Sequence, residues 1–534
     1  MKMLDQLVAF LGKNPISSER VSQQKVLNLS LDSRQIRIGD AFIALQGEQV
    51  HGLDFLANVL PQQPAIIFSD QCPTQAQQQR LDAYPDMVCL VVEHLAKRLA
   101  DLANWFYDQP SQRIKVVGVT GTNGKTSVAF YTAQLLNGLG QKTALMGTLG
   151  NGVFKQGQDT LAETVNTTPD VVTVHRLLAE FIQQNVDWVI MEVSSHALEL
   201  GRVDGVVFDT VALTQVTRDH IDFHGSLNAY QDAKKKLFTD YPSRIKVLNA
   251  SDAIGKKIID LFSQTAEHSV YIWCYTLIKP VEKMPFNCEL CCPKLILTPE
   301  GMLLELTGTA LMGGGEKIFN PIFVPLMGAF NAENVLCALS IILASDLNRN
   351  TTHFWDDLVK GLSTLQASKG RMQLIELPET YPTVMVDFAH TPDALQQVLF
   401  AVKQHLNLFS GRLWVVFGCG GDRDFGKRPL MAKTVESLAD CIMVTSDNPR
   451  FEAPEQIIQH ILSGFKYVDS VNVVLDRQKA IEQVLALAKA KDVVFIAGKG
   501  HESYQNIKGV KIPFQDEKIV LNWVLGVKQH GKPE

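Results

Sequence analysis

A glycine-rich segment, Gly121–Ser127, has the residue types that bind the phosphates of a nucleotide, since it reads Gly-Thr-Asn-Gly-Lys-Thr-Ser. It lies between the apolar run 114–119 and a helical pattern, so backbone N–H groups and a helix N-terminus can surround phosphate oxygens. Lys125 adds a positive charge, and the hydroxyl of Thr126 can reach Mg²⁺. The strict pattern requires glycine where this chain has Val119, so the loop is a variant. We expect it to bind ATP, in preference to GTP; the alternative is a tight turn with an incidental lysine.

Acidic and histidine side chains follow the next apolar runs. Glu192 lies near the end of the run 188–193, and the carboxyl ends of parallel strands face the ligand crevice, so it is placed to hold Mg²⁺. The segment 217–224 puts two aspartates and two histidines within six residues. That spacing indicates metal or phosphate chemistry, or else a polar loop that caps a helix. The triplet 234–236 is lysine throughout, which on its own is typical of a solvated helix face.

An arginine, Arg450, follows the apolar run 441–445 in the sequence Ser-Asp-Asn-Pro-Arg. Its planar guanidinium can pair with a carboxylate through two parallel hydrogen bonds, and the alternative is a structural salt bridge. The glycines of 418–421 resemble a dinucleotide loop, but Arg423 occupies the place of the third glycine. NAD binding is therefore rejected.

Alternating strands and helices are predicted to position these residues. Helical spacing covers 93–107 and 125–136. Apolar runs predict strands at 41–45, 65–68, 87–92, 114–119, 188–193, 207–214, 247–249, 383–388, 413–418, 441–446 and 493–497. The alternation implies an α/β fold with mainly parallel sheets and helices on both faces.

Length and composition bound the class of protein. At roughly 150 residues per domain, 534 residues correspond to about 3.6 domains. Hydrophobic residues make up 46% and the net charge is −6, which excludes a mostly disordered chain and a global basic field for nucleic acid. We find no signal-peptide pattern, no run of about 20 apolar residues and an odd count of 9 cysteines, so a cytoplasmic protein with reduced thiols is expected.

Several motifs together resemble the signatures of the Mur ligase family. In chain order they are GTNGKTS, MEVSSHAL, RDHIDFHG followed by YQDAK, LMGAFNAEN, DFAHTPDAL, GCGGDRDFGKRPLM and SDNPR. The match extends from Leu31 to Glu502, and it is greatest to the members that add diaminopimelate. The resemblance implies an N-terminal UDP-binding domain over 1–92, a central ATP-binding domain over 93–362 and a Rossmann-like domain over 363–534 that receives the amino acid.

The implied reaction is ATP-dependent amide formation in peptidoglycan precursor synthesis. The D-Glu carboxylate of UDP-N-acetylmuramoyl-L-alanyl-D-glutamate takes the γ-phosphoryl group, and the amine of meso-diaminopimelate attacks the acyl phosphate. By resemblance the catalytic residues are Lys125, Lys234, His220 and Glu192. Mg²⁺ is assigned to Thr126, Glu192, His220 and Lys234, with Lys234 matching the family's carbamylated lysine. ATP is assigned to Gly121, Thr122, Asn123, Gly124, Lys125, Thr126, Ser127, Asn331, Arg371 and Asp387.

The resemblance also assigns the other two substrates. UDP would contact Leu31, Ser33, Glu48, Gln49 and Val50, and the muramoyl dipeptide would contact Asn166, Thr167, Thr168, Ser194, Leu200 and Arg202. Leu200 replaces a glutamine of the family and is a weaker site; helix capping is the other reading of the Ser, Thr and Asn residues. Diaminopimelate is assigned to Arg423, Asp447, Asn448, Pro449, Arg450, Gly498 and Glu502.

The choice of amino acid depends on Arg450. Diaminopimelate has a second carboxylate where lysine has none, so a fixed guanidinium favours diaminopimelate.

The alternatives are a lysine-adding Mur ligase, a ligase like folylpolyglutamate synthetase, and a P-loop NTPase acting as a motor or switch. We expect a monomer with no nucleic-acid or membrane partner.

Four cysteines, Cys274, Cys288, Cys291 and Cys292, crowd a segment that looks expanded relative to the family. The spacing of Cys288 and Cys291 could begin a zinc site, but no second pair completes it. Unpaired thiols in a surface hairpin are therefore expected.

Overall fold

The computed structural model describes residues 1–14, 24–47, 49–158, 160–164, 166–264, 271–277, 289–298, 300–308, 321–345, 353–406 and 411–530. The chain divides into two compact units. The first comprises Met1–Lys125 and Gly140–Trp273, and the second comprises Thr126–Leu139 and Cys274–Glu534.

The first unit begins with a small parallel sheet. Its strands run in the order β3 (Leu29–Ser30), β4 (Ala41–Ala44), β5 (Ile66–Ser69) and β6 (Cys89–Val91). Helices α1 (Leu4–Phe10), α3 (Leu56–Val59) and α4 (Gln75–Asp82) accompany it. Helix α5 (Leu95–Phe106) buries Leu95, Leu99, Leu102 and Phe106 in the same core, which gives this helix its apolar spacing.

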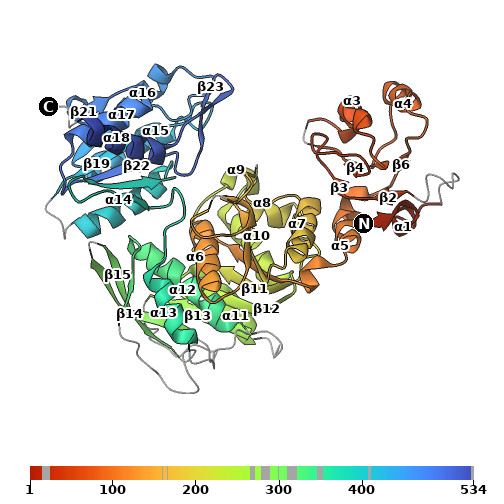
Figure 1. Ribbon diagram of the computed structural model, residues 1–534, viewed down its shortest axis with the longest axis horizontal. Helices are drawn as coiled ribbons and strands as arrows, with labels where there is room; N and C mark the ends of the chain where they lie inside the picture. The colour runs from red at the N-terminus through yellow and green to blue at the C-terminus, as the bar shows by residue number, and fades with distance from the viewer. Residues whose placement is uncertain are drawn as a thin grey trace. The chain divides into compact units, whose positions relative to one another are not determined.

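A larger sheet follows in the first unit, with strands in the order β12-β11-β7-β10-β8-β9. All of its neighbours are parallel except β8 and β9. The strands are β7 (Lys115–Thr120), β8 (Thr143–Gly147), β9 (Gly150–Val153), β10 (Trp188–Glu192), β11 (Phe208–Leu213) and β12 (Ser243–Asn249). The helices of this part are α7 (Val171–Gln183), α8 (Ser195–Glu199), α9 (Ile221–His224), α10 (Leu227–Thr239) and α11 (Ala253–Gln264) (Figure 1).

Register brings the ends of three strands of this sheet to one edge. In β7, Val119 lies opposite Glu192 of β10, and Thr120 lies opposite Leu213 of β11. The phosphate loop therefore begins beside the residues that follow β10 and β11, as the parallel pattern predicts.

The second unit contains α6 (Lys125–Gly138) except for its first residue, Lys125, which ends the first segment of the first unit. Strand β13 (Tyr271–Thr276) begins in the first unit and ends in the second. Strands β14 (Glu289–Thr298), β15 (Gly301–Thr307) and β16 (Ile322–Val324) come next and pair antiparallel. Helices α12 (Ala329–Ala344) and α13 (Phe354–Ser363) follow them.

The last part of the second unit is a sheet with strands in the order β17-β18-β22-β19-β20-β21 and helices on both faces (Figure 1). Its strands are β17 (Gln373–Ile375), β18 (Thr383–Asp387), β19 (Leu413–Phe417), β20 (Cys441–Val444), β21 (Val471–Val473) and β22 (Val493–Ala497). Alternate strand residues enter two separate cores. One core includes α14 (Pro392–Leu406), α15 (Lys427–Leu438) and α16 (Pro454–Leu462), and the other includes α17 (Arg477–Leu487) and α18 (Asp516–His530). A hairpin of β23 (Tyr504–Ile507) and β24 (Val510–Pro513) lies between β22 and α18 in the chain.

The predicted strands and helices are confirmed to within a few residues, but the expectation that the cysteines lie at the surface is wrong for the three that the structure describes. Cys274, Cys291 and Cys292 form no disulfide, and they are buried in β13 and β14 rather than at the surface. Burial raises the pKa of Cys292 to about 11, so its thiol stays protonated at neutral pH. Cys288 lies outside the described residues, and within the described ones no three His, Cys, Asp or Glu side chains are grouped as a metal site. No helix in the described ranges is long and apolar enough to cross a membrane.

Candidate active site

The phosphate loop is folded against the end of β11. A Cβ atom on Gly121 would lie 1.8 Å from Oγ1 of Thr214, and Gly124 has a φ of +87°, so both positions require glycine. Thr214 donates a hydrogen bond from Oγ1 to the carbonyl of Asn123 at 2.6 Å. The N–H of Thr122 donates to the carbonyl of Gln215 at 2.7 Å. These contacts fix the loop before any ligand is bound.

Two lysines converge on this loop. Nζ of Lys125 donates to the carbonyls of Gly121 and Thr122, at 2.9 Å each. Nζ of Lys234, on α10, donates to the same carbonyl of Gly121 at 2.7 Å, and its side chain is only 2% exposed. Burial, with a further contribution from the Lys125 charge, holds the pKa of Lys234 well below its usual value. Lys234 is therefore unlike a surface lysine, whereas Lys235 and Lys236 are partly exposed.

Glu192 lies at the end of β10 in a space left by a glycine. A Cβ atom on Gly147 would lie 2.3 Å from its Oε1. Thr148 donates to Oε1 from its backbone N at 2.8 Å and to Oε2 from its hydroxyl at 3.3 Å. These hydrogen bonds hold the carboxylate of Glu192 in place at the end of β10.

The residues assigned to the muramoyl dipeptide lie around the same strand end. Oγ1 of Thr168 donates to the carbonyl of Glu192 at 2.8 Å and accepts from the N–H of Ser194 at 3.1 Å. Arg202 donates to the carbonyl of Thr168 at 3.1 Å. The hydroxyls of Thr167 and Thr148 lie 3.2 Å apart. Ser194 also caps α8, so capping and ligand binding are not exclusive; Leu200 is 56% exposed.

His220 is part of an aromatic group beside this edge. Its backbone is left-handed, with a φ of +50°, and its ring centroid lies 4.7 Å from that of His196. His196 in turn stacks near Phe223 at 4.1 Å. Burial, and next the neighbouring His220, lower the pKa of His196, so the neutral form of the His196 ring is favoured.

A cavity of about 850 Å³ in the first unit includes two of the predicted substrate residues, Leu31 and Asn166. Four cations line it, and the structure gives an ion pair to Arg34 and to Arg176. The other cations that line the cavity are Lys142 and Lys155. Ser33, Gln49 and Val50 are not among the lining residues, and Glu48 lies outside the described residues.

The residues assigned to diaminopimelate come together at the ends of β19, β20 and β22. A Cβ atom on Gly421 would lie 1.9 Å from the carbonyl oxygen of Pro449. Arg450 donates from Nη1 to the carbonyl of Gly421, and Arg423 is exposed on the same loop. The glycine run therefore allows two loops to approach closely. A Cβ atom on Gly498 would lie 2.5 Å from Oδ2 of Asp447, which joins the third loop to them.

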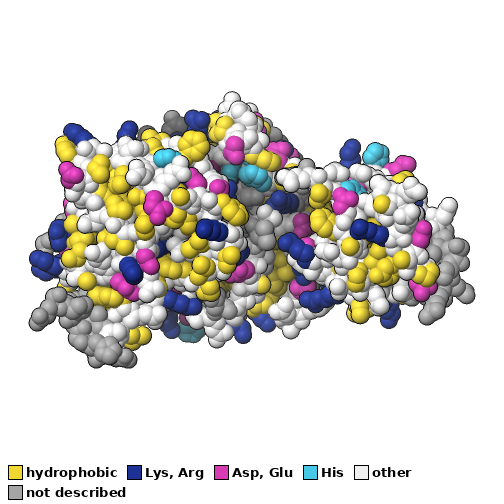
Figure 2. Space-filling view, turned by 90° about the horizontal axis from the view of Figure 1, so that it is seen from above, with side chains coloured by type: hydrophobic (Ala, Val, Ile, Leu, Met, Phe, Trp, Pro, Cys, Tyr) yellow, Lys and Arg dark blue, Asp and Glu magenta, His cyan; other side chains and the backbone are white. Residues whose placement is uncertain are grey.

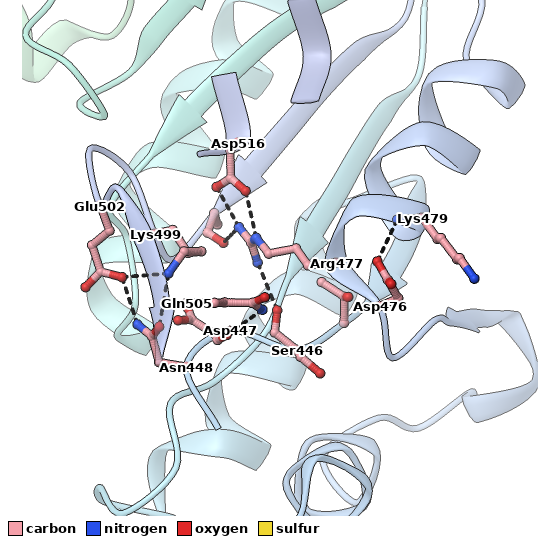
Figure 3. A network of polar contacts seen from close by, with 12 residues as sticks. Ser446, Asp447, Asn448, Asp476, Arg477, Lys479, Lys499, Glu502, Gln505 and Asp516 are labelled. Carbon is pink, nitrogen blue, oxygen red and sulfur yellow. Dashed lines mark hydrogen bonds and ion pairs between the residues drawn. The ribbon is translucent and has the colours of Figure 1, made fainter. Parts of the chain in front are cut away.

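Asn448 and Glu502 are hydrogen-bonded directly to each other and belong to a larger polar network (Figure 3). Nδ2 of Asn448 donates to Oε2 of Glu502 at 2.7 Å. Lys499 donates to Oδ1 of Asn448 at 3.1 Å and to Oε2 of Glu502 at 2.8 Å. The structure thus brings the predicted residues of separate motifs into one group.

The remaining residues assigned to ATP belong to the second unit. Asn331 is 1% exposed, and its Oδ1 accepts from the hydroxyl of Tyr131 at 3.1 Å. Asp387 accepts from two backbone N–H groups, at 2.7 and 2.6 Å, while burial raises its pKa. The guanidinium of Arg371 lies 4.9 Å from the ring centroid of Phe388.

Some supporting residues were missed from the sequence. Thr148 holds Glu192, and Lys499 holds Glu502. Arg428, whose side chain is fully buried, forms an ion pair with Glu452 and donates to the carbonyl of Gly420. Arg428 lies inside the quoted motif GCGGDRDFGKRPLM, and Lys499 lies between the assigned residues Gly498 and Glu502, so a charged residue in a glycine-rich segment was the signal in the sequence.

Comparisons with known proteins match all three parts of the chain. The Mur ligase family, catalytic domain, matches residues 25–107; the Mur ligase middle domain matches 119–342; and the Mur ligase glutamate ligase domain matches 370–500. A protein of Pseudomonas putida named UDP-N-acetylmuramoyl-L-alanyl-D-glutamate–2,6-diaminopimelate ligase is 38% identical, with 97% of this chain and 98% of that protein covered. A protein of the same name from Xylella fastidiosa is 39% identical, with 93% of each covered.

Solved structures agree with the family models. A structure titled with the same ligase name is 31% identical, covers 99% of both chains and has a TM-score of 0.63. A folylpolyglutamate synthase of Mycobacterium tuberculosis covers 76% of this chain and 92% of its own, with a TM-score of 0.56, but at 18% identity it shows only a shared fold. Three family domains matched in order, with relatives this similar over nearly the whole length, show that the chain belongs to the Mur ligase family.

Proposed function

We propose that this Mur ligase joins meso-diaminopimelate to UDP-N-acetylmuramoyl-L-alanyl-D-glutamate, using ATP, in the cytoplasmic synthesis of peptidoglycan precursors. The observation that carries the proposal is the 38% identity, over 97% of the chain, to a ligase of that name. ATP use follows from the family. The geometry supports the same chemistry, because Lys125, Lys234 and Glu192 lie at one edge of one sheet.

The chemical problem is that a carboxylate does not react with an amine, because its oxygen is a poor leaving group. Transfer of the γ-phosphoryl group to the D-Glu carboxylate forms an acyl phosphate and releases ADP. The amine nitrogen then attacks the acyl carbon, and phosphate leaves with the electrons of the C–O bond as the amine loses a proton. The protein's contribution is to position these groups and offset their charge.

The phosphate-binding role falls to the loop and its lysines. Backbone N–H groups of Gly121–Ser127 would surround phosphate oxygens, and Lys125 would turn from the loop carbonyls toward the transferred phosphate. Asn331, Arg371 and Asp387 are proposed to bind the nucleoside.

The residues at this edge fit a magnesium ion. The Glu192 carboxylate lies in a space that a Cβ on Gly147 would fill, and the Thr126 hydroxyl follows Lys125 in the chain. Both are oxygen donors, the type that Mg²⁺ prefers. His220 is the remaining member of the proposed set. Mg²⁺ would offset the negative charge of the phosphates during transfer.

Lys234 is proposed to act as a carbamate. Its neutral amine would attack carbon dioxide, forming an N–C bond and releasing one proton, and the product is an anionic oxygen donor. The reason is geometric: two ammonium groups that share one carbonyl repel each other, whereas a carbamate would attract Lys125.

Substrate selection is assigned to two regions. The 850 Å³ cavity is proposed to hold the UDP part, because Leu31 and Asn166 lie in it and because its lining includes Lys142 and Lys155, although four acidic side chains also line it. In the second unit, Arg450 and Arg423 are proposed to pair with carboxylates of diaminopimelate, and Glu502 with an ammonium group. The domain boundaries at 92/93 and 362/363 and the monomeric state stay predictions.

Phosphate release measured with purified protein tests the proposal. We expect release only when ATP, UDP-N-acetylmuramoyl-L-alanyl-D-glutamate and meso-diaminopimelate are all present, and at least about tenfold less with L-lysine. Equal rates with lysine would favour a lysine-adding ligase. Release without the UDP substrate would reject the proposal and favour a simple NTPase.

A further inference from the structure

Lys499 is a buried lysine among the residues assigned to the amino-acid substrate. Its side chain has no exposed surface, although it follows β22 by only two residues. The reaction proposed above gives Lys499 no role. Its ammonium group instead donates to Oδ1 of Asn448 at 3.1 Å and to Oε2 of Glu502 at 2.8 Å (Figure 3).

These contacts determine which way the amide of Asn448 faces. Oδ1 accepts from Lys499 and from the backbone N–H of Asn506, at 2.9 Å. Both partners can only donate, so the amide oxygen must face them and the NH₂ group must face the other side. Without Lys499, only the Asn506 N–H opposes a flip of the amide.

The ammonium group of Lys499 also determines which oxygen of Glu502 remains available to a ligand. Oε2 accepts from Lys499 and from Nδ2 of Asn448. The carboxylate is 24% exposed, and in the described part of the chain its Oε1 has no hydrogen-bond partner. Asn448 thus offers a donor and Glu502 an acceptor side by side, which suits the carboxylate and ammonium of an amino-acid centre.

The loops that bear this pair are held at their roots by another buried cation. Arg477 donates to the carbonyls of Ser446, at 3.4 Å, and Ala497, at 2.9 Å, and forms a two-bond ion pair with Asp516. Ser446 and Ala497 directly precede the loops that contain Asn448 and Lys499. Arg477 therefore fixes the backbone where the two loops begin, and Lys499 acts only on the side chains of Asn448 and Glu502.

We infer that Lys499 is a positioning residue for the zwitterionic centre of the amino-acid substrate, because it fixes the donor face of Asn448 and leaves Oε1 of Glu502 available for an ammonium group. The inference rests on the proposed function and deepens it. The substrate class is an α-amino acid bound through both its charged groups.

Steady-state kinetics of Lys499→Met test the inference. We expect the KM for meso-diaminopimelate to rise about 10- to 100-fold, since hydrogen bonds to charged groups are lost, while the KM values for ATP and the UDP substrate stay within about twofold. Lys479→Met is the matched control, because Lys479 is an exposed lysine of the same unit whose side chain points away from the network (Figure 3). It should leave all three KM values unchanged.

A double-variant cycle separates positioning from a structural role. Asn448→Ala removes the amide that Lys499 is inferred to orient, so adding Lys499→Met to it should cost less than Lys499→Met costs in the wild type. Additive losses, or a lower kcat with an unchanged KM for diaminopimelate, would overturn the inference. If Lys499→Met does not fold, Lys499→Gln decides instead: its amide still has a donor for Asn448, so the KM for meso-diaminopimelate should stay within about threefold of the wild-type value, and a 10- to 100-fold rise contradicts the inference. Inactive wild-type protein would instead refute the proposed function.

Discussion

Lys234 and Lys125 both donate to the carbonyl of Gly121, so their two ammonium groups lie close together and repel each other. Two cations near one acceptor, one of them buried, favour loss of a proton from the buried group. Sequence spacing alone made all three lysines of 234–236 look like a solvated face; only the YQDAK motif separated Lys234 from its neighbours. The structure supplies the physical reason for that separation, since burial distinguishes Lys234 from Lys235 and Lys236.

Lys234→Ala is expected to lower turnover at least about a hundredfold, because it removes the amine that would form the carbamate. The measurement is phosphate release with saturating substrates, with and without added bicarbonate, which should not restore activity. Lys235→Ala, a neighbouring partly exposed lysine, is the control and should retain near-normal activity. Near-normal turnover of Lys234→Ala would remove the carbamate proposal.

The Arg428–Glu452 ion pair predicts a pH effect on stability. Arg428 donates to both carboxylate oxygens, at 3.1 and 2.6 Å, and lowers the pKa of Glu452 below 4.5. When folding lowers the pKa of a carboxyl group, the group stabilises the folded state at every pH above its pKa in the unfolded chain. This contribution is lost as the pH falls through the pKa of the group in the folded protein.

Thermal unfolding of wild type and Glu452→Gln from about pH 7 to about pH 3 measures this contribution. The wild type should have the higher midpoint at neutral pH, and the difference should shrink below about pH 4.5. A difference that stays constant with pH would show that the ionised carboxylate of Glu452 does not contribute.

At the scale of elements, the strands could be predicted because each is a short apolar run, and parallel pairing then placed Glu192 and the phosphate loop at one edge. The side chains that support the site could not be predicted in this way. Thr148 follows β8 at an ordinary turn, and nothing in its neighbours indicates that it holds Glu192. The hairpin expected around the cysteines is present, since β14 and β15 pair antiparallel, but no motif in the sequence indicates that Cys274, Cys291 and Cys292 are buried.

The loop after β22 depends on Gly498, which gives an element-scale prediction. Its φ is +112°, and a Cβ atom would lie 2.5 Å from Oδ2 of Asp447. Gly498→Ala is therefore expected to lower stability by about 1–3 kcal/mol and to raise the KM for diaminopimelate, because the loops of Asp447 and Glu502 must separate.

Gly526→Ala is the control for this prediction. Gly526 lies in α18, where a Cβ atom would meet nothing within 4 Å, and alanine favours a helix interior. Its unfolding midpoint should be equal to or above that of the wild type. A Gly498→Ala protein with wild-type midpoint and KM would show that the close approach to Asp447 is not required.

At the scale of the whole molecule, charges of both signs are mixed over the visible surface, whereas the proposed binding regions lie in separate units. The net charge is −6, and Figure 2 shows Lys and Arg side chains interspersed with acidic ones on the visible face. We therefore expect anionic ligands to be bound by a few individual cations and not by a general positive field. The cavity assigned to UDP lies wholly within the first unit, whereas the residues assigned to diaminopimelate lie wholly within the second.

This separation predicts where UDP alone acts on the chain. Because a ligand protects the part of the protein that binds it, UDP should slow amide hydrogen exchange in 29–35 and 166–176 of the first unit. It should leave 447–452 and 498–507 of the second unit unchanged. Lys155→Glu, inside the cavity, should weaken UDP binding at least about threefold, whereas Lys97→Glu, exposed on α5 outside it, should not. Protection confined to the second unit would place the UDP site elsewhere and separate the cavity from substrate binding.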